Sequence, residues 1–169
     1  MANRLNGIDR GLMDQINSWP APAWIRVWMV AASWLGNGWL WWGIGFAILL
    51  AGGRYRVLIA GGVAVGLAQG LGRLLKIAVS RERPCAARKH VWARVPPPDP
   101  YSFPSAHTMT AFAFALAVGM GIPELLWWLV FAAASVAASR IVLGLHYLSD
   151  VVAGGILGAG IGWATHLWL

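Results

Sequence analysis

Three polar clusters interrupt an otherwise apolar chain, and their residue types suit phosphate chemistry. Cations bind phosphate oxygens, and a histidine beside a carboxylate can act as a nucleophile or carry a proton. Together such groups could hold a phosphate and cleave its ester. The clusters are a basic run with Lys76, Arg83 and Pro84, the segment Pro104-Ser105-Ala106-His107, and a group formed by Ser139, Arg140, His146 and Asp150.

The third cluster contains a candidate nucleophile. His146 and Asp150 are four residues apart, so they share one face if the segment is helical. A neighbouring carboxylate fixes the tautomer of an imidazole and raises its basicity, which prepares the other ring nitrogen to attack phosphorus. Arg140 could clamp phosphate oxygens with its fork of donors. The alternative is a structural ion pair between Arg140 and Asp150 near the end of a span.

The second cluster predicts the start of a helix. Pro104 and Ser105 precede an apolar run, which places Ser105 near the N-cap. The first amides of a helix lack partners and, with the helix dipole, favour an anion. His107 could give or take a proton near neutral pH. An ordinary helix cap with an interfacial histidine is the alternative.

The first cluster adds cations that can lower the barrier to phosphoryl transfer. Lys76 and Arg83 are the candidates, although spacing alone does not exclude Arg81 or Arg73. Two histidines and an aspartate could ligate zinc, but Lys76, Arg83 and Arg140 would repel a metal cation. We therefore expect catalysis without a metal ion or a cofactor.

The composition indicates a membrane protein. Of the 169 residues, 59% are hydrophobic and only 11% are charged, and twelve are Trp. The net charge is +7, and seven of the 13 cations lie between Arg73 and Arg94. Such a cluster could bind nucleic acid. Its apolar flanks favour an anionic lipid or a phosphate ester instead, so we expect a bilayer and a lipid phosphate as partners and no nucleic acid.

The apolar segments predict an all-α, polytopic membrane helix bundle that forms a single domain. Four of them approach the length of a span: 57–75, 105–122, 125–143 and 147–169. Residues 24–51 are interrupted at Gly36-Asn37-Gly38 and could form one kinked span, or an interfacial piece followed by a short span. We expect five spans, with four or six as alternatives.

Residues 1–22 predict an interfacial amphipathic helix, with Ile8, Leu12 and Ile16 on an apolar face and Asp9 and Asp14 on a polar one. Residues 80–104 form the long polar loop, stiffened by four prolines, and its charges indicate an active-site loop.

The order of the spans predicts that the three clusters meet. The first cluster ends one span, the second begins the next, and the third lies between the last two spans. All three therefore fall on one membrane face.

Two glycine stripes recur at four-residue intervals, one at Gly62, Gly66 and Gly70 and the other at Gly154, Gly158 and Gly162. We expect both to allow close helix packing. A groove lined by glycines is the alternative.

In order, these residues closely resemble the motifs of the type 2 phosphatidic acid phosphatase (PAP2) superfamily. Its first motif, Lys, six residues and Arg-Pro, is matched by Lys76, Arg83 and Pro84. Its second, Pro-Ser-Gly-His, is matched at 104–107 except that Ala106 replaces the usual glycine. Its third, Ser-Arg, five residues, His, three residues and Asp, is matched in full at 139–150. The resemblance covers roughly residues 33–169.

The resemblance implies a role for each residue. His146 would form a phosphohistidine, Asp150 would orient it, and His107 would protonate the leaving group. The groups that hold the phosphoryl oxygens would be Lys76, Arg83, Ser105, Arg140 and the backbone amides near Ala106. Ala106 would narrow the pocket slightly.

The membrane-spanning layout resembles the lipid phosphatase branch of the superfamily. The implied substrates are phosphatidic acid, phosphatidylglycerol phosphate and polyprenyl phosphates or diphosphates such as undecaprenyl diphosphate. The expected location is the inner membrane of a bacterium, with the active site on the periplasmic, outer face; Arg54 and Arg56 fall on the opposite face, as the positive-inside rule favours. A lipid phosphotransferase that uses the same site and a non-catalytic binder or transporter are the alternatives. The sequence leaves the oligomeric state open.

Overall fold

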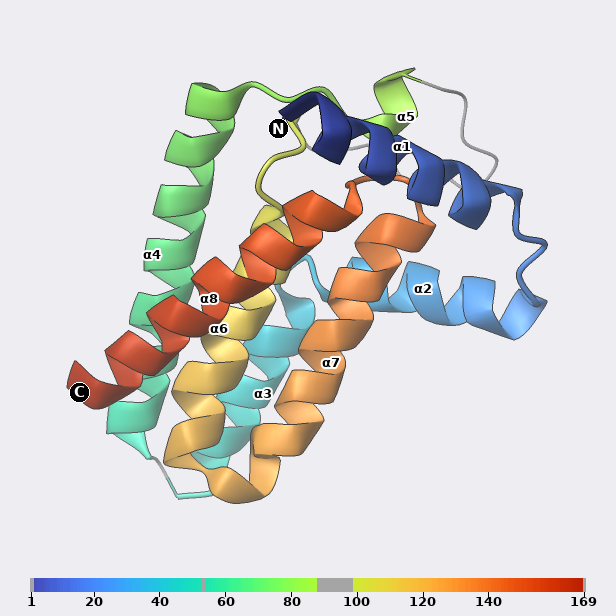
Figure 1. Cartoon of the computed structure of the whole chain (residues 1–169). Coiled ribbons are helices and arrows are strands. Elements are labelled where there is room, and N and C mark those ends of the chain that lie inside the picture. The colour runs from blue at the N-terminus through green and yellow to red at the C-terminus, as the bar shows by residue number, and fades with distance from the viewer. Residues whose placement is uncertain (1, 53, 88–98, 169) are drawn as a thin grey trace.

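A computed structural model describes residues 2–52, 54–87 and 99–168, and this part of the chain folds into eight helices (Figure 1). The helices are α1 (Ala2–Ser18), α2 (Ala23–Leu35), α3 (Trp39–Leu50), α4 (Tyr55–Val79), α5 (Pro84–Ala87), α6 (Ala106–Gly121), α7 (Pro123–Val142) and α8 (Leu148–Trp168). The predicted all-α fold is confirmed.

Three of the described helices, α4, α7 and α8, are long and apolar enough to cross a membrane, whereas α2, α3 and α6 are apolar but shorter. Of the two arrangements left open for residues 24–51, the structure has the broken one. The chain turns at Gly36-Asn37-Gly38. Figure 1 shows that α2 lies across the bundle, whereas α3 runs along the bundle with the other helices. Among the described residues, the bundle therefore contains five helices: α3, α4, α6, α7 and α8.

The bundle is apolar outside and partly polar inside, the reverse of a soluble domain. Large apolar side chains such as Leu74, Trp127 and Ile156 are exposed on its outer surface. By contrast, the ionisable groups of the three clusters are buried, among them Arg83 and His146. Ionisable groups at membrane depth face the interior because lipid cannot solvate them.

The two glycine stripes have different roles. In α8, the prediction of close packing is confirmed: a Cβ on Gly154 would lie 2.7 Å from the carbonyl oxygen of Ser105, and Cβ atoms on Gly158 and Gly162 would collide with the α6 backbone. In α4 the prediction is wrong, because a Cβ on any of its three glycines would meet nothing within 4 Å. Of the two stripes, the one on α4 faces open space and the one on α8 does not.

The N-terminal helix α1 packs on the start of α8 and on α7. The predicted faces of α1 differ from the structure at two positions: Asp9, expected on the polar face, is buried with Met13, and Ile8, expected on the apolar face, is exposed. Asp9 can be buried because Arg81 Nη2 donates to its Oδ2 at 2.8 Å and the backbone N–H of Ser149 donates to its Oδ1. The hydroxyl of Ser149 also donates to Asp9.

Candidate active site

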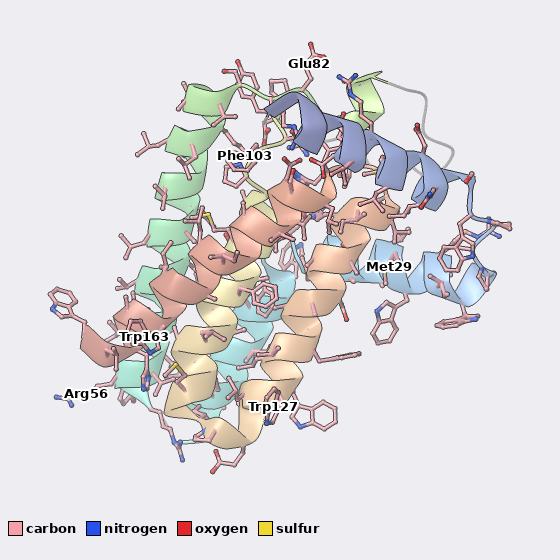
Figure 2. The ribbon with its side chains drawn as sticks, in the orientation of Figure 1. Met29, Arg56, Glu82, Phe103, Trp127 and Trp163 are labelled. Atoms are coloured by element: carbon pink, nitrogen blue, oxygen red, sulfur yellow. The ribbon has the colours of Figure 1, made fainter. Side chains whose placement is uncertain are left out.

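The three polar clusters meet at one end of the bundle, as predicted. Tight turns bring them there: Ser80, the C-cap of α4, has a φ of 49°, and Gly144 has a φ of 67° in the turn after α7. The two ends of the long loop are joined by an antiparallel β-bridge between Glu82 and Tyr101. Figure 2 shows Glu82 and Phe103 at this end, far from Arg56 and Trp127 at the other. Residues 88–98 of the predicted loop lie outside the described part.

The hydrogen bonds of His146 fix its tautomer. Its Nδ1 lies 2.6 Å from the carbonyl oxygen of Ser102, and a carbonyl can only accept, so Nδ1 carries the proton. Its Nε2 therefore has a lone pair, which accepts a hydrogen bond from Arg83 Nη1 at 3.0 Å. The nitrogen that is free to act as a nucleophile thus faces a guanidinium group that could hold a phosphate.

Burial keeps the imidazole in its nucleophilic form. His146 is 1% exposed, and this burial lowers its pKa to about 4 in spite of the nearby Asp150 carboxylate. The ring is protonated only as the pH falls through about 4. Near neutral pH the ring is therefore neutral, with its Nε2 lone pair available.

Asp150 holds the surrounding backbone more directly than it holds the imidazole. Its Oδ2 lies 3.8 Å from His146 Nδ1, too far for a hydrogen bond, whereas it accepts the backbone N–H of Tyr147 at 2.9 Å. Its Oδ1 accepts a hydrogen bond from Arg81 at 2.7 Å. The structure therefore differs from the sequence expectation, because the group that orients the ring by hydrogen bonding is the Ser102 carbonyl.

An acid that the sequence reasoning passed over, Asp99, joins the two candidate phosphate-binding cations. Lys76 Nζ lies 2.6 Å from its Oδ2 and Arg83 Nη2 lies 2.9 Å from its Oδ1. Arg83 Nε also donates to the backbone carbonyl of Asp99 at 2.7 Å. Although partial burial would raise it, hydrogen bonds from Lys76 and Arg83 hold the pKa of the Asp99 carboxyl below its usual value. An anion thus already sits where phosphate oxygens are expected.

A second group of contacts lies between α2, α6 and α7. His107 Nε2 lies 2.8 Å from Asn37 Oδ1, so this nitrogen carries a proton. Arg140 Nη1 donates to Ser33 Oγ at 2.9 Å, and its Nη2 points to Asn37 Oδ1 at 3.5 Å. The Gly36-Asn37-Gly38 turn is held here because Gly36 packs against Val136, where a Cβ would lie 2.8 Å from a methyl group.

Ser105 is the N-cap of α6, as predicted, and its backbone N–H donates to the Asp150 carbonyl at 3.0 Å. Its hydroxyl is fully buried against Thr108 Oγ1 at 2.9 Å and does not line the cavity described next. Ala106 and His107, in the first turn of α6, do line it.

A cavity of about 540 Å³ leads from these groups along α4. At the site end it is bounded by Lys76, Asp99 and His107, and further along by glycines and aromatic side chains. Arg83, Arg140 and His146 lie behind this wall and are almost completely buried. Asp99 therefore faces the cavity, whereas the candidate nucleophile His146 does not.

Several of the contacting residues had weak sequence signals. Asn37 lies between two glycines, a pattern that indicates a break in the chain and no contact with His107. Asp99 is the sole acid between Arg83 and His107. Ser102 contributes a backbone oxygen, which any residue type supplies. The sequence does not exclude Arg81 as a phosphate-binding cation. In the structure, Arg81 forms ion pairs with Asp150 and Asp9 rather than lying beside Lys76.

Comparison with known proteins gives a consistent assignment. The family profile described as the PAP2 superfamily matches residues 57–169. Decaprenylphosphoryl-5-phosphoribose phosphatase of Mycobacterium tuberculosis is 38% identical over 129 residues, which cover 74% of this chain and 68% of the relative. Undecaprenyl-diphosphatase of Sulfolobus acidocaldarius is 32% identical over 92 residues, which cover 54% of this chain and 45% of the relative.

Two crystal structures share the fold. The transmembrane PAP2 type phosphatidylglycerolphosphate phosphatase from Bacillus subtilis superposes with a TM-score of 0.78 at 21% identity and covers 98% of this chain and 86% of its own. LpxE of Aquifex aeolicus has a TM-score of 0.79 at 24% identity and covers 92% of each chain. At these identities the likeness concerns the helical architecture.

Proposed function

Because the chain belongs to the PAP2 superfamily and is a membrane phosphoric monoester or diphosphate hydrolase, we propose that it removes the terminal phosphate of a membrane lipid through a phosphohistidine on His146. The observation that carries the proposal is the state of His146. Its Nδ1 proton is committed to the Ser102 carbonyl, and its Nε2 lone pair faces Arg83 at 3.0 Å.

In the proposed first step, Nε2 attacks phosphorus and the bond from phosphorus to the lipid oxygen breaks. Lys76, Arg83 and Arg140, with Ser105 and the amides at Ala106, stabilise the charge on the phosphoryl oxygens. His107, at the cavity wall, gives a proton to the leaving oxygen. Asp150 fixes the turn that carries His146 and, from 3.8 Å, stabilises the positive charge that the attacking imidazole acquires.

In the second step, water attacks the phosphohistidine, the phosphorus–nitrogen bond breaks and His107 takes the proton of the water. Phosphate leaves and the neutral imidazole is restored. Three arginine and lysine groups around the phosphate supply the positive charge that a metal ion supplies in other phosphatases, so we propose a reaction that needs no metal ion.

The substrate is a lipid whose tail occupies the cavity along α4. The names of the relatives give three candidate classes: a polyprenylphosphoryl sugar phosphate, a polyprenyl diphosphate and phosphatidylglycerol phosphate. The proposed location is the inner membrane of a bacterium, with the site on the outer face. Arg54 and Arg56 lie at the opposite end of α4, which agrees with that orientation.

A substrate panel tests the function. The purified protein in a non-ionic detergent is expected to release phosphate from at least one of phosphatidic acid, phosphatidylglycerol phosphate and undecaprenyl diphosphate, at the same rate with and without EDTA. A rate abolished by EDTA would contradict the metal-free mechanism. Absence of release from all three would contradict the function.

Replacing Asp99 tests whether its carboxylate competes with phosphate. We expect Asp99→Asn to lower both the KM and the inhibition constant of inorganic phosphate three- to tenfold, about 0.6–1.4 kcal/mol, because Lys76 and Arg83 lose an anionic partner. Steady-state kinetics measures both constants. The matched control is Glu82→Gln, which removes an exposed carboxylate at the same end of the protein and should leave both constants unchanged. An unchanged or raised inhibition constant in Asp99→Asn would show that Asp99 supports the site.

A further inference from the structure

A network of charged groups connects the N-terminal helix α1 to Asp150. Arg81 lies between two carboxylates, because its Nη2 donates to Asp9 Oδ2 at 2.8 Å and its Nη1 donates to Asp150 Oδ1 at 2.7 Å. The same Nη1 lies 2.8 Å from Ser149 Oγ, and the backbone N–H of Ser149 donates to Asp9 Oδ1 at 3.2 Å. Figure 1 shows α1 lying across the end of the bundle where α8 begins. Three segments that are far apart in the sequence therefore meet in one hydrogen-bonded network.

The charges of this network are shielded from water. The side chain of Asp9 is 6% exposed, that of Arg81 is 19% exposed and that of Asp150 is completely buried. The guanidinium group also covers the ring of Tyr147, with its Cζ 4.2 Å from the ring centroid. Charges in such surroundings interact more strongly than charges on a surface and are screened less by salt. The loss of one charge here therefore changes the potential at neighbouring groups.

The three ionised groups together carry one net negative charge, since Arg81 is paired with both Asp9 and Asp150. The Asp150 carboxylate lies 3.8 Å from His146 Nδ1, and its negative charge acts on the imidazole from there. Arg81 alone would largely cancel that charge. Asp9 offsets the charge of Arg81 from the other side of the guanidinium group, so the group as a whole remains negative toward the imidazole.

The proposed reaction needs this negative charge. The imidazole of His146 becomes positive when its Nε2 bonds to phosphorus, and it already lies 3.0 Å from the guanidinium group of Arg83. A more positive potential at the ring would oppose the attack, whereas a counter-charge that is fixed in place before the reaction lowers the barrier.

Building on the proposed function, we propose that Asp9 is a positioning residue for phosphoryl transfer. It holds Arg81 on Asp150 and offsets the charge of Arg81, so that Asp150 remains an effective counter-ion for the phosphorylated imidazole. Asp9 does not line the cavity, so it acts through Arg81 and Asp150 and not on the substrate. Helix α1 then contributes a residue to the rate of the reaction.

A pair of variants separates this electrostatic role from a structural one. Asp9→Asn keeps the shape of the side chain but makes the group of three neutral. We expect it to lower kcat about 10-fold, a coupling in the range found for residues of one network, and to change the inhibition constant of inorganic phosphate less than about threefold. Adding Arg81→Gln restores one net negative charge, and the amide of glutamine can still donate to Asp150. The double variant is expected to recover kcat to within about threefold of the wild type, although both ion pairs are lost.

The matched control is Arg10→Gln, which removes a charge from the exposed neighbour of Asp9 on α1 and should leave both constants unchanged. Steady-state kinetics on the best substrate of the panel measures the constants, and size-exclusion chromatography in detergent shows whether each variant is folded. A folded double variant near the wild-type rate supports the proposal even if Asp9→Asn alone does not fold.

Three results would overturn the proposal: an unchanged kcat in Asp9→Asn, a folded double variant that remains about 10-fold slower than the wild type, or a failure of both variants to fold, which would assign Asp9 to the fold alone. In each of these cases the wild-type protein still releases phosphate, so the proposed phosphatase function stands. If the wild-type protein releases phosphate from no lipid of the panel, the function itself fails and the inference fails with it.

Discussion

His146→Ala is expected to lower phosphate release by about four orders of magnitude or more, the size of effect seen when a nucleophile is removed from an enzyme. The lone pair of Nε2 is lost, and no other described side chain places a neutral nucleophile against Arg83. Phosphate can still bind, since the surrounding cations remain. Release of phosphate from the best substrate of the panel, followed in detergent, measures the effect.

A histidine far from the site provides the control for His146→Ala. His166 lies in the last turn of α8, at the opposite end of that helix from Asp150, and His166→Ala should retain full activity. The His146 variant should also elute from size-exclusion chromatography like the wild type. A properly folded His146→Ala protein that keeps more than a tenth of the wild-type rate would rule out the phosphohistidine mechanism.

Arg83→Lys is expected to lower kcat/KM about 100- to 1000-fold, although the charge is kept. Arg83 uses its whole fork: Nε donates to the Asp99 carbonyl, Nη2 to the Asp99 carboxylate, and Nη1 to both the Leu145 carbonyl and His146 Nε2. An ammonium group is a point charge and cannot reach all of these acceptors at once. The lysine would leave buried acceptors unpaired and the phosphate less well oriented.

The Arg83 variant should therefore lose rate more than affinity. Steady-state kinetics is expected to show a large fall in kcat and a change of less than tenfold in the inhibition constant of inorganic phosphate. Arg56→Lys, the same substitution at the far end of α4, should have no effect. A kcat for Arg83→Lys within threefold of the wild type would show that charge alone is required at this position.

Much of the helical layout could be predicted because bilayers constrain sequences strongly. Apolar length located α4, α7 and α8, and the proline and serine at 104 and 105 located the start of α6. Counting the crossings was then enough to predict that the three clusters meet. The spacing of His146 and Asp150, by contrast, suggested a direct hydrogen bond that the structure replaces with the Ser102 carbonyl. Backbone oxygens have no sequence signature.

The glycine stripes show a second limit of sequence reasoning. Both repeat every four residues, and helix geometry treats them alike. Their difference depends on the neighbour that each faces: α8 presses its stripe into the backbone of α6, whereas the stripe on α4 faces open space, in part across the cavity from α3. Helix α3 begins directly after the break at Gly36-Asn37-Gly38, and its Trp41 and Trp42 line the same cavity as Gly62 and Gly66.

The burial of Asp9 has a consequence for how such chains are compared. The family match begins at residue 57, yet Asp9 neutralises Arg81, Ser33 holds Arg140 and Asn37 holds His107. Two proteins could therefore agree in every motif residue and still differ in how firmly those residues are held, according to their first fifty positions. The side chains that position the motif residues thus come partly from a region that a motif search never reads.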